Sequence, residues 1–156
     1  MRKRSKYKPK PILQNPLGYV VESATPLIEH DTYVVDWQLK NNSAFEKLLK
    51  GLADKKDINT LVAARNITEG LMVTLKGTDT DGTLARSAVA LIDLCNRGNE
   101  GKSLVMKAEE LQAMRDMMQL HDELLEVVTV RQFERALEYT KNEIRIGRAQ
   151  HLKEFT

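Results

Sequence analysis

The sequence contains a single cysteine, Cys95, among its 156 residues. One thiol excludes a framework of disulfides within the chain and favours a reducing compartment. No apolar run is long enough to span a bilayer. The basic first residues lead into Pro-Lys-Pro rather than into an apolar stretch, so we expect neither secretion nor membrane insertion. At this length we expect one domain whose core needs no metal or disulfide.

Proline is also scarce, and it is confined to the first 26 residues, at Pro9, Pro11, Pro16 and Pro26. The rest of the chain therefore has no proline to interrupt a helix. We expect residues 1–18 to form an extended arm, because alternating lysine and proline disfavour helix and the like charges repel. Residues 19–156 are predicted to form a single, mainly helical domain.

The first ten residues contain no acidic side chain and six basic ones, which are Arg2, Lys3, Arg4, Lys6, Lys8 and Lys10. The formal charge of the chain is +2, so without these six charges residues 11–156 carry −4. Lysines and arginines in an extended arm bind the backbone of a nucleic acid without reading its sequence. Tyr7 adds a ring that can stack on an unpaired base.

Residues 30–41 alternate between apolar and polar side chains, with Tyr33, Val35, Trp37 and Leu39 on one side. This period of two is typical of a half-buried strand. With residues 19–22 as its partner, the segment predicts a β-hairpin over residues 19–41. A single hairpin needs a helical surface on which to rest.

Helix caps and apolar spacing dominate residues 43–148 and predict a compact bundle of about five helices. The capping box of Ser43 and Glu46 starts a short helix, which ends before Gly51. A second capping box at Thr129 starts the last helix, which runs to about Gly147 or Arg148. The three helices between them are expected over residues 55–76, 83–96 and 104–128, and the first of them is capped by Asp54 or Asp57. The helix over 83–96 is apolar over a wide arc, so it is predicted to be the central one.

Residues 96–103, NRGNEGKS, end like a phosphate-binding loop. Such a loop needs a glycine five positions before its second glycine, and Asn96 occupies that position. The preceding residues fit a helix, and no later strand completes a parallel sheet. We therefore expect a helix end and a polar turn, with a nucleotide binder that uses Lys102 and Ser103 as the alternative.

Residues 77–82, GTDTDG, have the composition of a calcium-binding loop. Aligned on Gly82, however, the segment lacks the carboxylates required at the first and twelfth positions. We expect it to form the turn and the N-terminal cap of the helix over 83–96, where acidic residues also suit the helix dipole.

Several single residues have structural interpretations that we favour over catalytic ones. Arg65 and Glu69, four residues apart, are expected to form a partly buried ion pair. His121 lies in the apolar stripe of its helix, as expected of a hydrogen-bonded core or interface residue. Cys95 is expected to be buried. We predict no catalytic residue, no cofactor and no metal site, and hence no enzyme.

Two further surfaces are candidates for binding. Lys141, Arg145 and Arg148 share one helix face and, with the arm, can form a composite basic surface that holds phosphates. The alternative is that they compensate the dipole at a helix C-terminus. The helix over 104–128 is acidic and rich in methionine, which pads a core or forms a flexible partner-binding groove. Its outer face is a candidate docking surface for basic arms.

The strings MRKRSKYKPKP, VVDWQLKN, NITEGL and MQLHDELLEVVTV together resemble a group of small proteins predicted from tailed bacteriophages and prophages of Gram-negative bacteria. The motifs of this group have no assigned chemistry. The resemblance implies action in the bacterial host cytoplasm or in a phage particle, and it favours a non-enzymatic host-takeover or anti-defence protein.

Our leading hypothesis from the sequence is a non-enzymatic phage-type accessory protein, acting as a homo-oligomer, that binds nucleic acid non-specifically through the basic arm. The alternative is a protein-binding inhibitor or assembly factor that acts through helical surfaces on a bacterial host protein.

Overall fold

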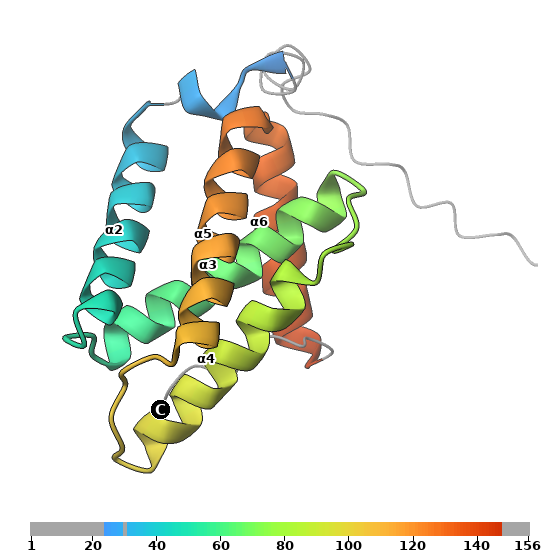
Figure 1. Ribbon diagram of the computed structural model, residues 1–156. Coiled ribbons are helices and arrows are strands. Elements are labelled where there is room, and N and C mark those ends of the chain that lie inside the picture. Colours follow the sequence, from blue (N-terminus) through green and yellow to red (C-terminus); the bar gives the residue numbers. More distant parts are fainter. Residues whose placement is uncertain (1–23, 30, 148–156) are drawn as a thin grey trace, which may run out of the picture.

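A computed structural model describes residues 24–29 and 31–147 of the chain. These residues form a short 3-10 helix and five α-helices, with no strand among them (Figure 1). The mainly helical fold is therefore confirmed. The elements are η1 (Leu27–Glu29), α2 (Asp31–Leu49), α3 (Lys55–Thr74), α4 (Thr83–Asn99), α5 (Ala108–Val127) and α6 (Val130–Ile146). None of these described helices is both long enough and apolar enough to cross a membrane.

Helix α2 replaces the strand that the sequence predicts over residues 30–41. The expected helix start at Ser43 is wrong as well, because Ser43 lies inside α2. The true inward face follows helical spacing, and Val35 and Leu39 are exposed. The residues of that face are Val34, Trp37, Asn41, Ala44 and Leu48, of which all but the partly buried Trp37 are buried. The predicted partner strand over 19–22 and the basic arm over 1–18 lie outside the described residues.

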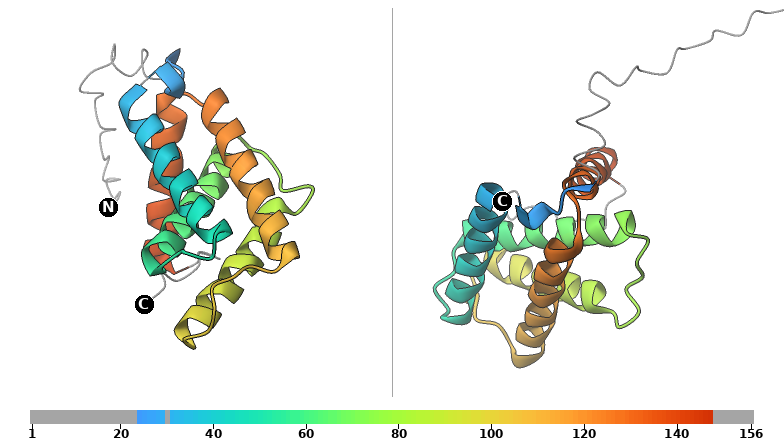
Figure 2. Two further views of the ribbon diagram at one scale, coloured as in Figure 1. Left: turned by 60° about the vertical axis from the view of Figure 1, so that its left-hand side comes forward. Right: turned by 90° about the horizontal axis from the view of Figure 1, so that it is seen from above.

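Helix α3 is the centre of the bundle, because it packs against each of the other four α-helices (Figures 1 and 2). The prediction that the helix over 83–96 is central is wrong. Its counterpart α4 packs against α3 and α5, and these two neighbours leave Val89 and Ile92 exposed. Helix α4 therefore has more apolar surface than its neighbours α3 and α5 cover.

The core consists of two clusters of buried side chains that meet along α3. One cluster contains Met114, Met117 and Met118 of α5 and Cys95 of α4. The interpretation of these methionines as core padding and of Cys95 as a buried thiol is therefore confirmed. The second cluster joins η1, α2, α3, α5 and α6 through Leu27, Val34, Ile67, Leu71, Leu124, Leu125, Val128 and Ala136.

Several helix ends follow the predicted caps, although α5 begins at Ala108 rather than at about residue 104. Asp54 and Thr129 each form a capping box, and Gly147 takes the left-handed conformation at the end of α6. In the GTDTDG segment, Asp79 accepts hydrogen bonds from the backbone N–H groups of Leu84 and Ala85, both at 3.0 Å. This segment is therefore the turn and cap of α4, as expected.

Candidate functional site

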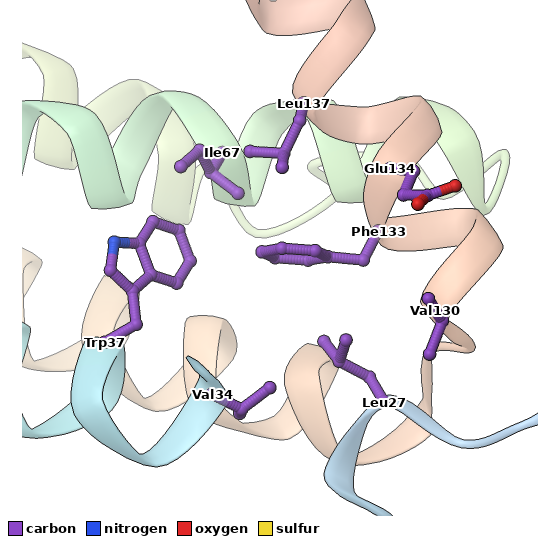
Figure 3. Close-up of a pocket in the computed structure, with 8 residues that line it drawn as sticks. All are labelled: Leu27, Val34, Trp37, Ile67, Val130, Phe133, Glu134 and Leu137. Carbon is purple, nitrogen blue, oxygen red and sulfur yellow. The ribbon is translucent and has the colours of Figure 1, made fainter. Parts of the chain in front are cut away.

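An apolar groove of about 510 Å³ lies between α2, α3 and α6, beside η1 (Figure 3). Its size is in the usual range for ligand pockets of proteins. Trp37 of α2 and Phe133 of α6 extend into the groove from opposite sides (Figure 3). Among the described residues of its lining, Glu134 is the only charged one. The lining residues are Leu27, Val34, Trp37, Ile67, Val130, Phe133, Glu134 and Leu137.

The segment before η1 is held beside this groove by backbone hydrogen bonds. The N–H of Leu27 donates to the carbonyl of Val128 at 2.9 Å, and the N–H of Val130 donates to the carbonyl of Thr25 at 3.1 Å. These two bonds hold residues 25–27 against the junction of α5 and α6. Leu27 is buried as a result, and it joins the lining of the groove.

The indole ring of Trp37 is held by two aromatic contacts. Its centroid lies 5.6 Å from that of Phe133, with an angle of 80° between the ring planes, and 5.4 Å from that of His121, with an angle of 60°. Edge-to-face contacts of this kind are favourable for aromatic pairs. Trp37, which lines the groove, is therefore in direct contact with His121, a polar residue of the core.

His121 is fully buried, with 0% of its surface exposed, and both of its ring nitrogens have partners. The Thr68 hydroxyl donates to the carbonyl of Ala64 at 2.8 Å, so it accepts from Nδ1 of His121, also at 2.8 Å. Nε2 then accepts from the amide of Asn41 at 3.3 Å. Burial lowers the pKa of His121 to about 4, which keeps the ring neutral. The prediction of a hydrogen-bonded core histidine is confirmed.

Two partly buried ion pairs lie where α4 contacts its neighbours α3 and α5. Arg65 pairs with Glu69 on α3, as predicted, and its side chain also donates to the carbonyl of Leu84 in α4 at 3.5 Å. The second pair was not predicted: Arg97 of α4 donates two hydrogen bonds to Glu110 of α5, at 2.6 and 2.8 Å. The hydrogen bonds from Arg97 hold the pKa of Glu110 below its usual range. The contacts of both pairs join neighbouring helices, and they explain the pairs as structural features.

The NRGNEGKS segment forms the end of α4 and the turn after it. Gly101 adopts a positive φ of 69°, which favours glycine, and Lys102 pairs with Glu100 at 2.6 Å. The hydroxyl of Ser103 accepts from the N–H of Val105 at 3.2 Å. The predicted helix end and polar turn are confirmed.

The structure describes two of the ten predicted nucleic-acid contacts. Lys141 and Arg145 are exposed on the last turns of α6, and within the described residues neither forms an ion pair. Arg145 donates to the side chain of Asn142 at 2.9 Å. The others lie outside the described residues: Arg2, Lys3, Arg4, Lys6, Tyr7, Lys8, Lys10 and Arg148.

The groove is not predicted by the alternating pattern of residues 30–41, because this pattern assigns one wall of the groove to a strand. A signal was nevertheless present in the three-and-four spacing of Val34, Trp37, Asn41, Ala44 and Leu48, which is typical of a buried helix face. A polar residue, Asn41, interrupts this stripe and hides it. In the structure Asn41 is buried because it binds His121.

Comparison with known proteins adds no relative: the chain matches no protein-family model, no curated protein and no solved structure. The groove and the charges near it are therefore the observations that bear on function.

Proposed function

We propose that the protein is a non-enzymatic binding protein whose apolar groove takes an amphipathic segment of a partner protein. The observation that carries this proposal is the groove itself, where apolar side chains from three helices and η1 surround an open space. Docking the apolar face of a helix into such a groove is a common mode of peptide recognition. The rigid, half-buried rings of Trp37 and Phe133 are the kind of anchor that dominates binding energy.

The charged side chains beyond the groove indicate which charges a partner segment carries. Leu137 lines the groove, and Lys141 and Arg145 follow it at intervals of four residues on the same face of α6. Both cations are exposed. A segment that fills the groove with apolar side chains and continues along α6 therefore meets positive charge. We infer that the partner segment carries acidic residues at this end, since complementary charges set orientation and specificity.

The resemblance to phage and prophage proteins supports a bacterial host protein as the partner. In that setting the protein acts in the host cytoplasm as an inhibitor or assembly factor, and it needs neither a cofactor nor a metal for this role. Masking or recruiting a partner helix requires only the groove and the charges beside it.

Trp37 is the only tryptophan of the chain, so its fluorescence reports on the groove. The probe is a synthetic amphipathic peptide of about 15 residues with glutamates after its apolar row. We expect a saturable blue shift of the emission, and binding about tenfold weaker when lysines replace the glutamates. Replacing Lys141 and Arg145 together by glutamate should reverse this preference.

Leu137→Glu should abolish the fluorescence change, whereas Val127→Glu, on an exposed side chain of α5 outside the groove, is the matched control. A photo-crosslinker at Phe133 identifies the occupant in the full chain. A crosslink to residues 1–23 of the same chain, or an emission that no peptide of the series shifts, would contradict the proposal.

Nucleic-acid binding is the second candidate function. It is supported by six basic residues in the first ten and by the exposed Lys141 and Arg145 of α6, neither of which forms an ion pair in the described part of the chain. We expect gel shifts with single- and double-stranded DNA and RNA that weaken steeply with salt, because the contacts release counterions. Deletion of residues 1–10 should remove them. Absence of binding at ~50 mM salt, or unchanged affinity after the deletion, would exclude this function.

A further inference from the structure

Helix α4 has an apolar row on its solvent side. Ala85, Val89 and Ile92 follow one another at intervals of four and three residues, and all three are exposed. The side chains of Val89 and Ile92 are 60% and 44% exposed, although the free side of a surface helix is ordinarily polar. The packing of α4 on α3 and α5 does not cover this row.

A hollow of about 290 Å³ lies beside the row, between α4 and α5. Two buried alanines, Ala90 and Ala113, lie in its lining next to Val89. Glu110 also contributes, but Arg97 already holds its carboxylate. The exposed charged residues of the lining are two basic and two acidic ones: Arg86, Lys107, Asp93 and Glu109. One face of α4 thus has protruding apolar side chains next to a small-residue hollow with balanced charges.

A protrusion and a matching hollow on the same face suit contact with an identical face, because a twofold contact uses one patch twice. Arg86 and Asp93 lie seven residues apart on α4, with Val89 about midway between them. In an antiparallel pair of α4 helices with the twofold axis near Val89, Arg86 of each copy faces Asp93 of the other. The charges are therefore complementary in two symmetrical places.

Arg86 already donates to Asp116 of α5 at 3.2 Å, to the carbonyl of Asp81 at 2.5 Å and to the hydroxyl of Thr83 at 3.4 Å, and these bonds leave some of its N–H groups for this contact. A guanidinium group has five N–H donors, so it can bind a second carboxylate at the same time. Both side chains of the existing pair are partly exposed. Asp93 interacts electrostatically with Arg97, but within the described residues it forms no ion pair.

We propose that a second copy of this chain docks on the exposed face of α4 and forms an antiparallel, twofold-symmetric dimer. Val89 and Ile92 of each copy insert beside Ala90 and Ala113 of the other, and the two Arg86–Asp93 pairs set the register. This surface is separate from the groove, whose lining contains no residue of α4. The dimer therefore does not depend on the proposed function.

The test is the solution mass of the full chain, measured by analytical ultracentrifugation over a roughly hundredfold range of concentration. We expect a reversible dimer, and Val89→Glu should weaken its association by about tenfold or more. Val73→Glu, on an exposed side chain of α3, is the matched control and should leave the association unchanged. Melting temperatures establish that each variant folds.

Charge exchange tests the register. Arg86→Asp and Asp93→Arg should each weaken self-association, because like charges then face each other. An equimolar mixture of the two variants should form a heterodimer, in which all four charges are again paired. A wild-type chain that stays monomeric over the whole range would overturn the proposal. So would a dimer that Val89→Glu leaves intact, or two charge variants that do not combine.

Discussion

Lowering the pH from about 7 to about 4 is expected to remove roughly 3 kcal/mol from the free energy of unfolding through His121 alone. The ring has an ordinary pKa of 6.5, and burial lowers the pKa of His121 to about 4 in the folded chain. Between these values the unfolded chain binds a proton that the folded chain does not bind. The titration of His121 therefore leaves the free energy of unfolding unchanged above the ordinary pKa of 6.5, and it decreases this free energy as the pH falls from there toward 4.

The side chains that contact His121 do not titrate in this pH range. Its ring nitrogens contact Thr68 and Asn41, and its ring contacts Trp37. Two carboxyl groups also change the free energy of unfolding at acidic pH. Interactions with Arg97 and Lys107 hold the pKa of Glu110 low, so its stabilisation is lost only at lower pH, from about the ordinary value of 4.5 downward. Burial raises the pKa of Asp122, which opposes the effect of His121, because the folded chain then binds a proton first.

Urea unfolding at a series of pH values measures the effect, and His121→Gln is the informative variant. Glutamine is polar but does not titrate, so the variant should lose most of the slope between about pH 6.5 and 4.5, whatever its stability at neutral pH. His30 and His151 are retained in both proteins and serve as internal controls. An identical slope in the variant would show that His121 does not carry the pH dependence.

Gly70→Ala should destabilise the protein by about 1–3 kcal/mol, although alanine is the better helix former. Gly70 lies where α3 passes close to α6. A Cβ at this position would be 2.8 Å from the carbonyl oxygen of Ala136 and 2.7 Å from the hydroxyl of Thr140. The Thr140 side chain can turn away, but the backbone of Ala136 cannot move without displacing α6. The same contact includes a hydrogen bond from Thr140 to the carbonyl of Asn66 at 3.3 Å.

Chemical denaturation of the Gly70→Ala variant measures this loss of stability. The Ala63→Gly variant measures the effect of helix propensity alone, for comparison. Ala63 is exposed on the same helix, so its replacement reports helix propensity alone and should destabilise by about 1 kcal/mol. By propensity alone, Gly70→Ala should stabilise by a similar amount. A gain in stability for Gly70→Ala would show that α3 and α6 can move apart at this point without a decrease in the free energy of unfolding.

Local signals located α3, α4 and α6 closely, whereas the start of α5 was placed about four residues too early. The caps at Asp54 and Thr129 and the left-handed Gly147 depend on hydrogen bonds within a few residues, so the sequence alone shows them. The Arg65–Glu69 pair was predictable for the same reason, since one helical turn separates its partners. The pair of Arg97 and Glu110 joins two helices, and no spacing along the chain indicates it.

Helix α2 shows how a short pattern misleads. Tyr33, Val35, Trp37 and Leu39 alternate as in a strand, while Val34, Trp37, Asn41 and Leu48 follow a helix, and Trp37 belongs to both patterns. The helical pattern contains Asn41, a polar residue that is buried only because His121 provides a partner from α5. Its burial depends on a contact between residues 80 positions apart.

Periodicity, capping and composition along the chain are enough to predict the helical class, several helix ends, the core position of His121 and the concentration of positive charge in the first ten residues. The central place of α3, the meeting of Trp37 and Phe133 across a groove, and the exposure of Val89 and Ile92 on α4 depend instead on how the helices pack. An apolar stripe shows that a helix has a face to bury, whereas the position of the other helices determines whether that face is covered.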